Sequence, residues 1–516
     1  MPEQPLGNSV REYAQTRLIV GLSNDVVHAT ADTTLARAGL QVLERITEQG
    51  LAGSAALEVV SVSLAPGQTV EQAIAALANQ PGIAFAEPDW IVSTSVVPND
   101  PFYASGQLWG MLGDEISPTN TFGSQANEAW SLGAAYTGSM KTVVGVIDTG
   151  IDYTHPDLYL NVWLNPGEIS TLPFYANLVD ADADGLITFR DLNARNGLNQ
   201  LINGAYVTDV NGNGRIDAGD LLNDSRWENG TDGDGNGYVD DLIGWDFVNN
   251  DNDPMDDNGH GTHVSGTIGG IGGNGIGVVG VNWQTQIMAL KFLDASGSGY
   301  TSDATAALNY YTAKSLTPGN ALFVGTNNSW GGGGYLQSLQ AAIDATGQAG
   351  NLFVAAAGNG GSDQVGDNND SVANYPSNYS TTAALGWEAV IAVAAIDSTG
   401  NRASFSNYGN VTVDLAAPGV GIISSVPGGY ASLSGTSMAT PHVTGALALL
   451  KSVLPSATPQ QLISLLQNGL VPMSSLNPIT AWDGRLDIGD LIASLDSTPP
   501  TVSSITLSDS ALTVGE

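Results

Sequence analysis

The sequence predicts an α/β fold, in which a doubly wound, mostly parallel sheet follows a small α+β module. Between residues 101 and 495, short apolar runs of strand length alternate with segments of helical spacing. This alternation is typical of a parallel sheet that helices cover on both faces. The chain has 516 residues, of which 42% are hydrophobic, and this is enough for two or three globular domains with an ample core.

The small N-terminal module is expected over residues 18–94, after a tail of residues 1–17. Its strands are predicted at 18–22, 57–62 and 83–89, and its helix at 69–77. A polar stretch with prolines at positions 98 and 101 follows, so residues 95–101 are the expected linker.

The larger α/β unit is expected over residues 102–497, with an acidic insertion at 165–256. Its predicted strands are 142–147, 286–290, 322–326, 352–356 and 390–394, and its predicted helices are 302–314, 336–346 and 460–467. Residues 498–516 change to alternating Val, Ser, Ile, Thr and Leu. This change predicts the first strand of an immunoglobulin-like β-domain that is cut off at Glu516.

The composition excludes several classes of partner and of cross-link. The 14 Lys and Arg residues against 51 Asp and Glu residues give a net charge of −37. Nucleic acids and anionic membranes require a basic surface, so neither is an expected partner. The absence of cysteine rules out disulfides and thiolate metal sites. No apolar run is long enough to span a bilayer, and no ordinary signal peptide is visible at the start of the sequence.

Three glycine-framed motifs carry residues suited to acyl transfer. Asp148 ends the apolar run of Val-Val-Gly-Val-Ile-Asp-Thr-Gly, His260 lies in Asn-Gly-His-Gly-Thr-His, and Ser437 lies in Gly-Thr-Ser-Met-Ala-Thr-Pro-His. A serine hydroxyl becomes a strong nucleophile when a base removes its proton, and a carboxylate fixes the tautomer of that base. Asp, His and then Ser is also one of the known chain orders of the serine triad.

Other hydrolase chemistries fit these motifs less well. An aspartic protease needs a second Asp-Thr-Gly motif, which residues 397–400 do not match. The sequence around Ser437 is not Gly-x-Ser-x-Gly, and the serine comes last in the chain, against the α/β-hydrolase order. His260 and His263 lack the spacing and the glutamate of a zinc-binding His-Glu-x-x-His motif.

Together the three motifs resemble those of the subtilase family of serine proteases. The resemblance implies a subtilisin-like fold for the larger unit. It also implies that residues 18–94 are a ferredoxin-like inhibitory prodomain whose C-terminal tail lies in the active-site cleft, and that residues 95–101 are the processing linker. The alternative is an ordinary N-terminal domain that is never removed.

The same resemblance assigns the oxyanion and substrate-binding residues. Asn359, in Ala-Ala-Ala-Gly-Asn-Gly, is implied to donate to the oxyanion beside the Ser437 N–H group. Substrate contacts are implied for Ser329, Trp330, Gly331, Gly297, Gly299, Ala357 and Gly358. Glycine-rich backbone edges suit a peptide that binds as an added strand, although these segments could also be two solvent loops.

The acidic insertion contains three loops with the residue pattern of calcium ligands. Two of them have oxygen ligands at positions one, three and five, glycine at six and a carboxylate at twelve, as in an EF-hand loop. Their expected ligands are Asp180, Asp182, Asp184 and Asp191 in the first loop, and Asp209, Asn211, Asn213 and Asp220 in the second. The third loop, with Asp232, Asp234, Asn236, Asp240 and Asp241, departs from this pattern at its twelfth position and resembles a calcium-type loop of bacterial subtilases.

The subtilase resemblance implies one more calcium site, outside the insertion. Asp157 and Asn274 would bind the ion through their side chains, and Ile276 and Val278 through their carbonyls. The insertion has many carboxylates and few apolar residues, so we expect bound Ca²⁺ to order it. The alternative is that the loops are acidic, solvated turns.

These observations predict a calcium-dependent serine endopeptidase that is made as an autoprocessed proenzyme. Its expected partners are protein or peptide substrates and its own prodomain. An acidic, cysteine-free chain with calcium loops indicates an extracellular or cell-surface setting in a bacterium. Two alternatives remain open: a catalytically silent calcium-binding adhesion module, and an esterase or peptide ligase on the same scaffold.

Overall fold

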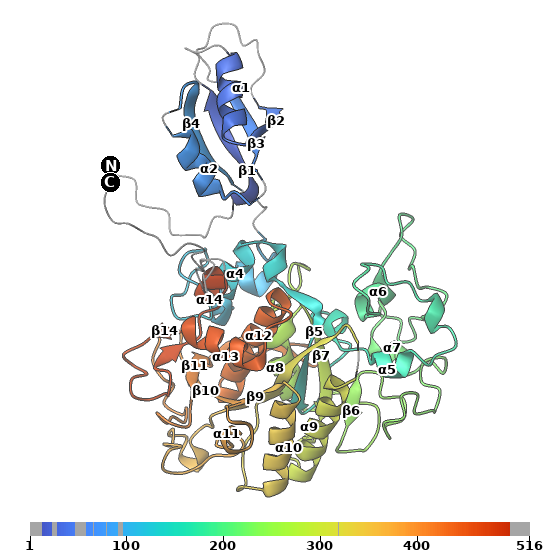
Figure 1. Cartoon of the computed structure of the whole chain (residues 1–516). Helices are drawn as coiled ribbons and strands as arrows, with labels where there is room; N and C mark the ends of the chain where they lie inside the picture. The colour runs from blue at the N-terminus through green and yellow to red at the C-terminus, as the bar shows by residue number, and fades with distance from the viewer. Residues whose placement is uncertain are drawn as a thin grey trace. The chain divides into compact units, whose positions relative to one another are not determined.

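A computed structural model describes residues 13–22, 28–46, 58–65, 67–78, 80–90, 96–317 and 319–495. The described residues divide into two compact units, those from 13 to 90 and those from 96 to 495, whose elements are labelled in Figure 1. The strand expected within residues 498–516, most of the expected tail and one end of the expected linker lie outside the described residues.

The described part of the N-terminal unit is a four-stranded antiparallel sheet with two helices. Its elements are β1 (Tyr13–Leu22), α1 (His28–Arg37), β2 (Gln41–Arg45), β3 (Glu58–Ser63), α2 (Val70–Leu77) and β4 (Ile83–Trp90), and the strand order is β2-β3-β1-β4. The helix and the three strands predicted from sequence are present. α1 and β2 were not predicted. The residues of β2 are all exposed and show no apolar alternation that would mark a strand.

In the described part of the second unit, nine strands form one sheet that is parallel except at one edge. The strand order is β14-β15-β11-β10-β9-β8-β5-β7-β6, and the β14–β15 pair is antiparallel. The strands are β5 (Gly138–Asp148), β6 (Gly244–Asp246), β7 (Gln284–Lys291), β8 (Leu322–Asn328), β9 (Leu352–Ala356), β10 (Val390–Ile396), β11 (Leu415–Pro418), β14 (Val471–Pro472) and β15 (Gly484–Arg485). The predicted α/β fold with a mostly parallel sheet is therefore confirmed.

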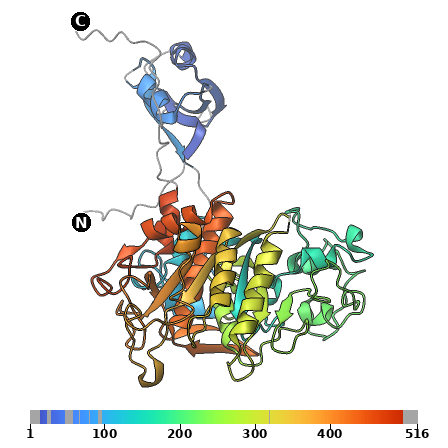
Figure 2. The ribbon, with the colours of Figure 1, turned by 60° about the horizontal axis from the view of Figure 1, so that its bottom comes forward.

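Two pairs of helices cover the two faces of this sheet (Figures 1 and 2). α8 (His260–Gly269) and α12 (Thr436–Val453) share an apolar core with Val144 and Val146 of β5. α9 (Thr301–Ser315) and α10 (Gln337–Gln348) share another core with Val143 and Ile147. Because successive strand residues point to opposite faces, β5 is apolar on both sides, which explains the unbroken apolar run before Asp148.

Shorter elements complete the second unit. They are α3 (Pro101–Ala104), α4 (Ala126–Ser131), α5 (Pro166–Ile169), α6 (Phe189–Asn193), α7 (Ala218–Leu221), α11 (Thr382–Leu385), α13 (Pro459–Asn468), α14 (Ile488–Leu495) and the hairpin of β12 (Ile422–Val426) and β13 (Gly429–Leu433). Among the described residues, no helix is both long and apolar enough to cross a membrane.

The acidic insertion has a small apolar core of its own, contrary to the expectation from its composition. Phe189, Leu192, Ile216, Leu221 and Trp227 are buried there. α6 and α7 each begin with a capping box, which satisfies N–H groups that the first helical turn leaves unpaired. Burial therefore contributes to the order of the insertion, and the acidic loops are attached to a packed scaffold.

Candidate active site

The three motif residues stand at the ends of different elements on one side of the sheet. Asp148 is the last residue of β5, His260 is the first residue of α8, and Ser437 is the second residue of α12. The carboxyl ends of parallel strands and the helices beside them commonly form binding crevices in α/β proteins. Here His260 lines a cavity together with Ser329, and the carbonyl of Ser329 contacts Ser437.

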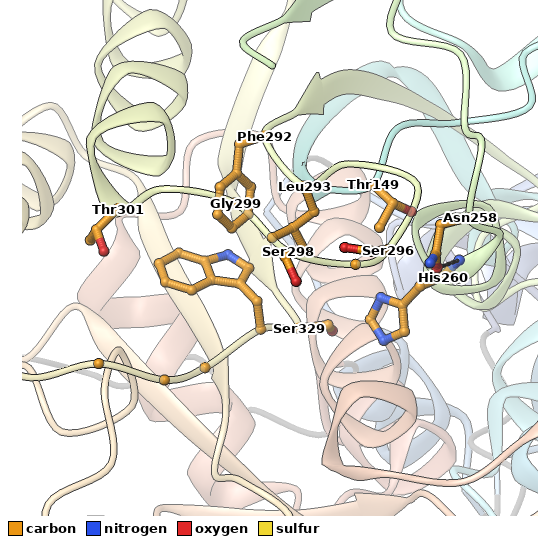
Figure 3. Close-up of a pocket in the computed structure, with 15 residues that line it drawn as sticks. Thr149, Asn258, His260, Phe292, Leu293, Ser296, Ser298, Gly299, Thr301 and Ser329 are labelled. Atoms are coloured by element: carbon orange, nitrogen blue, oxygen red, sulfur yellow. Dashed lines mark hydrogen bonds between the residues drawn. The ribbon is translucent and has the colours of Figure 1, made fainter.

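The imidazole of His260 is held by Asp148. Its Nδ1 lies 2.7 Å from Asp148 Oδ1, an oxygen that also accepts a hydrogen bond of 2.8 Å from Thr149 N. Asp148 is fully buried, whereas the His260 side chain is 27% exposed and lines the cavity of Figure 3. With its proton on Nδ1, His260 presents a basic Nε2.

The environment of His260 favours its protonated form. Burial opposes the imidazolium, but the charge and the hydrogen bond of Asp148 outweigh this effect, and the carboxylate of Asp256 adds to it. The pKa of His260 is therefore raised above its ordinary value. This is the shift that helps an imidazole to accept a proton from a serine.

The hydroxyl of Ser437 is turned toward a backbone carbonyl. Its Oγ donates to Ser329 O over 3.0 Å, and the structure has no hydrogen bond between this hydroxyl and His260 Nε2. Catalytic hydrogen bonds are often long or misaligned without substrate and tighten when substrate binds. Two of the three predicted triad residues are therefore in contact, while the third lies beside the same cavity.

Two N–H donors converge beside Ser437. A Cβ atom placed on Gly435 would lie 3.5 Å from Asn359 Nδ2 and 3.6 Å from Ser437 N, so both nitrogens lie close to the same point. The oxygen of the Asn359 amide accepts hydrogen bonds from Thr436 N (2.8 Å) and Thr436 Oγ1 (3.0 Å). This contact fixes the orientation of the Asn359 amide, as the predicted oxyanion role requires.

A cleft with a volume of about 640 Å³ extends from His260. Two glycine-rich segments line it, residues 296–299 and residues 329–333. Figure 3 shows Ser296, Ser298 and Gly299 on the first segment and Ser329 on the second. Five of the predicted substrate residues line this cleft, namely Ser329, Trp330, Gly331, Gly297 and Gly299. Ala357 and Gly358 do not line it, and Ala357 is fully buried.

Sequence analysis missed Asn374, which lies between two predicted substrate segments. A Cβ atom on Gly358 would lie 3.1 Å from Asn374 Nδ2, and one on Gly331 would lie 3.6 Å from the same atom. The Asn374 amide donates to Ser377 Oγ over 3.1 Å. A polar side chain thus limits the space between Gly331 and Gly358, but no residue pattern marks it in the sequence.

His263 and His442 belong to the same motifs but are buried structural residues. His263 Nε2 lies 3.0 Å from Ile422 O, and His442 Nδ1 lies 2.9 Å from Met438 O. Burial lowers the pKa of each of these histidines to about 4. Both are therefore neutral at ordinary pH, and neither replaces His260.

The first acidic loop brings three of its four predicted ligands together. Carboxylate oxygens of Asp180, Asp182 and Asp184 lie within 4.8 Å of one another. Burial raises the pKa of Asp182 and of Asp184, and the neighbouring carboxylates add to the rise. Backbone N–H groups of residues 184–186 donate to these three carboxylates. Asp191 lies outside this group and accepts hydrogen bonds from two other backbone N–H groups. Three converging carboxylates that lack a lysine or arginine ion pair among the described residues fit a calcium ion.

The second acidic loop is held by hydrogen bonds among its own residues. Asp209 accepts from two backbone N–H groups, and Asp220 caps α7. The amides of Asn211 and Asn213 donate to Asp217 over 3.1 Å and 2.6 Å. Asp217 occupies the ninth position of the loop, which is a ligand position in EF-hand loops, but it was not among the predicted ligands.

At the third acidic loop, a lysine from a neighbouring helix lies where the sequence predicted a metal. Lys314 of α9 forms ion pairs with Asp234 and with Asp241, the latter at 2.9 Å. Glu168 joins these two carboxylates, and burial raises its pKa to about 7. Asp240 is not part of this group and accepts hydrogen bonds from two backbone N–H groups. Asp232 accepts hydrogen bonds from the N–H groups of residues 235–237, including that of Asn236.

The predicted calcium site outside the insertion gains a carboxylate that sequence analysis did not assign. Asp157 accepts from Asn274 Nδ2 (2.8 Å), Val278 N (2.9 Å) and Tyr430, while Ile276 N donates to Asn274 Oδ1.

Asp100 lies beside this group and is fully buried, and its Oδ1 has no hydrogen-bond partner. Burial raises the pKa of Asp100 to about 6, and Asp157 adds to the rise. Two crowded carboxylates and an orphaned oxygen fit a cation.

Comparisons with known proteins agree with this geometry. The family model described as "Subtilase family" matches residues 139–480, and the model described as "Fervidolysin N-terminal prodomain" matches residues 6–89. A thermophilic serine proteinase of Bacillus sp. (strain AK1) is 33% identical over 384 residues, which cover 74% of this chain and 67% of that protein.

Two further relatives show how the likeness is distributed. Subtilisin-like protease 1 of Plasmodium vivax is 32% identical over 358 residues, which cover 67% of this chain and 46% of that protein. Subtilisin Savinase of Lederbergia lenta is 40% identical over 235 residues, covering 45% of this chain and 78% of that protein. The match therefore spans about half of the Plasmodium protein but most of the short bacterial one. By these matches the chain belongs to the subtilase family of serine endopeptidases, and its N-terminal unit is similar to a subtilase prodomain.

Proposed function

We propose that this chain is a calcium-dependent endopeptidase, made as a proenzyme, that hydrolyses peptide bonds through an acyl-enzyme on Ser437. One observation carries the proposal. The hydrogen bond of 2.7 Å between Asp148 and His260 Nδ1 leaves Nε2 as the basic nitrogen beside the cleft where Ser437 is held. Membership of the subtilase family supports a catalytic role for this arrangement.

In the proposed reaction, the Ser437 hydroxyl turns from Ser329 O to His260 Nε2. His260 takes the proton as Oγ attacks the carbonyl carbon of the substrate peptide bond. The oxyanion that forms on the substrate then accepts hydrogen bonds from Ser437 N and Asn359 Nδ2. His260 then gives the proton to the leaving amine, the C–N bond breaks, and an ester remains on Ser437. A water molecule deprotonated by His260 attacks this ester, releases the acid and restores the serine.

The proposed substrates are extended peptides. Residues 296–299 and 329–333 offer glycine-rich backbone on two sides of the cleft, which suits a substrate bound as an added strand. Recognition through the main chain tolerates many side chains. Asn374, between Gly331 and Gly358, is the polar group that limits the space available to a substrate side chain there.

Calcium has a structural role in this proposal and takes part in no chemical step. Asp180, Asp182 and Asp184 would hold one ion, and Asp157 with Asn274 and Asp100 would hold another. Bound cations would convert carboxylates that repel one another into ligands and would stabilise the surrounding loops.

The N-terminal unit is proposed to be an inhibitory prodomain that is removed by cleavage within residues 95–101. Its match to a prodomain model supports this role. An extracellular or cell-surface location is the setting in which a calcium-dependent, cysteine-free protease would work.

A serine-directed probe tests the proposal. We expect a fluorophosphonate to label the wild-type chain on Ser437 and to leave Ser437→Ala unlabelled. Ser452→Ala is the matched control, because Ser452 lies at the far end of the same helix, with its hydroxyl bound to Leu449 O. Labelling of Ser437→Ala at the wild-type rate would refute the assignment of the nucleophile. A chain that takes the probe but cleaves small esters and no casein would be an esterase instead.

A further inference from the structure

A second carboxylate, Asp256, connects the motif of Asp148 to the motif of His260. Asp256 is only 4% exposed and lies in the segment that precedes α8. Its two oxygens accept five hydrogen bonds within the described residues. One comes from Thr149, the residue after Asp148, and four come from residues 258–262, which surround His260.

The five contacts divide between the two oxygens. Oδ1 accepts from Thr149 Oγ1 (2.8 Å), Asn258 N (2.9 Å) and Gly259 N (2.8 Å), and Oδ2 accepts from Thr262 N (2.9 Å) and Thr262 Oγ1 (2.5 Å). Thr149 Oγ1 in turn accepts from Gly261 N over 2.8 Å. The neighbours of Asp148 and of His260 are therefore joined through one carboxylate and one hydroxyl.

The start of α8 explains why a carboxylate is needed at this point. The first N–H groups of a helix have no partner within the helix, and the N-cap residue Gly259 has no side chain to bind them. Asp256 supplies the missing acceptor from outside the helix, and its negative charge suits the positive end of the helix dipole. His260, as the first residue of α8, is thus fixed by a group that it does not touch.

The backbone of the first turn of α8 packs closely against the segment that follows β5. A Cβ atom on Gly261 would lie 2.2 Å from Gly150 O and 3.2 Å from Asp148 Cβ. The segment after β5 and the first turn of α8 are therefore in direct contact. A loosened turn would change the distance between His260 and Asp148, on which proton transfer depends.

We propose that Asp256 is a positioning residue of the triad, which sets the distance and orientation of His260 relative to Asp148 through Thr149 and the first turn of α8. The inference rests on the proposed proteolytic function. It assigns to Asp256 no contact with substrate and no share in proton transfer.

The charge of Asp256 also affects the pKa of His260. Asp148 and Asp256 are the two carboxylates that raise the pKa of His260. The other ionisable groups nearby are Asp257, whose carboxylate pairs with Lys291 of β7 at 2.6 Å, and the neutral His263 in α8. His260 acts as a base only when neutral, so kcat/KM rises with pH as His260 loses its proton. Removing the charge of Asp256 would lower the pKa of His260 and move this acidic limb to lower pH.

The decisive test compares Asp256→Asn with the wild type in the full chain, using a fluorogenic peptide across a pH series. An asparagine keeps the shape but replaces one acceptor oxygen with an amino group that faces N–H donors. We expect kcat to fall about 10²-fold with KM nearly unchanged, and the acidic limb to move to lower pH. Asp251→Asn, the same change at an exposed carboxylate of the same connecting segment, should alter neither quantity.

If Asp256→Asn folds poorly, two substitutions at Thr149 test the same inference. Thr149→Ser retains the hydroxyl that joins Asp256 to Gly261 and should keep most of the activity, whereas Thr149→Val should lose kcat as Asp256→Asn does. Wild-type kcat and an unmoved acidic limb in Asp256→Asn would overturn the inference. So would equal activity of the two Thr149 variants. A wild type that the fluorophosphonate probe fails to label would instead count against the proposed function, so the two failures are distinguishable.

Discussion

The triad and the acidic insertion both concentrate carboxylates, but different groups satisfy them. Around the triad, Asp148 and Asp256 receive hydrogen bonds from His260, from hydroxyl groups and from backbone N–H groups of the protein itself. In the first acidic loop, Asp180, Asp182 and Asp184 converge, and burial together with neighbouring carboxylates raises the pKa of two of them. Backbone N–H groups of residues 184–186 also donate to these three carboxylates, but no lysine or arginine of the described residues pairs with them. The difference between the two regions is therefore a positively charged partner, which the imidazole of His260 can supply to Asp148 and which we propose a cation supplies to the first loop.

The third acidic loop lies between these two cases. Its sequence resembles that of a calcium loop, yet Lys314 pairs with Asp234 and Asp241, and Tyr310 donates to Asp241 over 2.5 Å. An ammonium group from a neighbouring helix supplies positive charge where a metal was expected. The same residue pattern therefore predicts the shape of a loop but not the source of the charge that neutralises it.

The largest expected effect tests the catalytic side of the comparison. Asn359→Ala should lower kcat about 10²- to 10³-fold with little change in KM, because its hydrogen bond to the oxyanion forms in the transition state. Steady-state kinetics at saturating calcium measure this, with the exposed turn residue Asn401→Ala as the control. If the substitution raises KM and leaves kcat unchanged, Asn359 binds the substrate and is not an oxyanion donor.

The third loop offers the next largest effect. Lys314→Met should destabilise the protein by about 3–5 kcal/mol in the absence of calcium, because it leaves a buried carboxylate unpaired. Added Ca²⁺ should restore part of this loss by binding in place of the ammonium. Denaturant unfolding with and without Ca²⁺ tests this, against Lys451→Met, whose lysine binds a backbone carbonyl rather than a carboxylate. A stability loss that Ca²⁺ does not reduce would mean that the loop cannot accept a cation.

Chelation should have a smaller effect on the wild type, and a localised one. A site at a hundredfold excess of Ca²⁺ over Kd contributes about 2.7 kcal/mol, so excess EGTA should lower the Tm by about 3 °C for each site that loses its ion. Autolytic cuts should then appear in residues 180–191 before residues 232–243, because Lys314 remains in the third loop. Mg²⁺ should restore the Tm poorly, since it requires tighter octahedral geometry. An unchanged Tm after verified removal of metal would make these loops solvated turns.

Local patterns in the sequence were enough to predict the sheet and to select candidates for the triad. The apolar run before Asp148 predicted β5, and the glycine-framed motifs pointed to His260, Ser437 and Asn359 because each motif lies within a few residues of chain. Their catalytic roles stay predictions. The exposed strand β2 had no such pattern. Asp100 and Lys314 could not be identified either, because their roles depend on partners far away in the sequence. Lys314 is 80 residues from Asp234, and Asp100 is a single aspartate in a proline-rich turn.

N-terminal sequencing of the purified chain after incubation with Ca²⁺ tests the central claim most directly. The account predicts that the wild type gains a new N-terminus within residues 95–101 and that Ser437→Ala, under the same conditions, keeps a single full-length chain. With EGTA, the wild type should instead be degraded at the first acidic loop. A Ser437→Ala chain that is cut at the same place as the wild type, free of other proteases, or a wild type that stays intact under all calcium conditions, would contradict it.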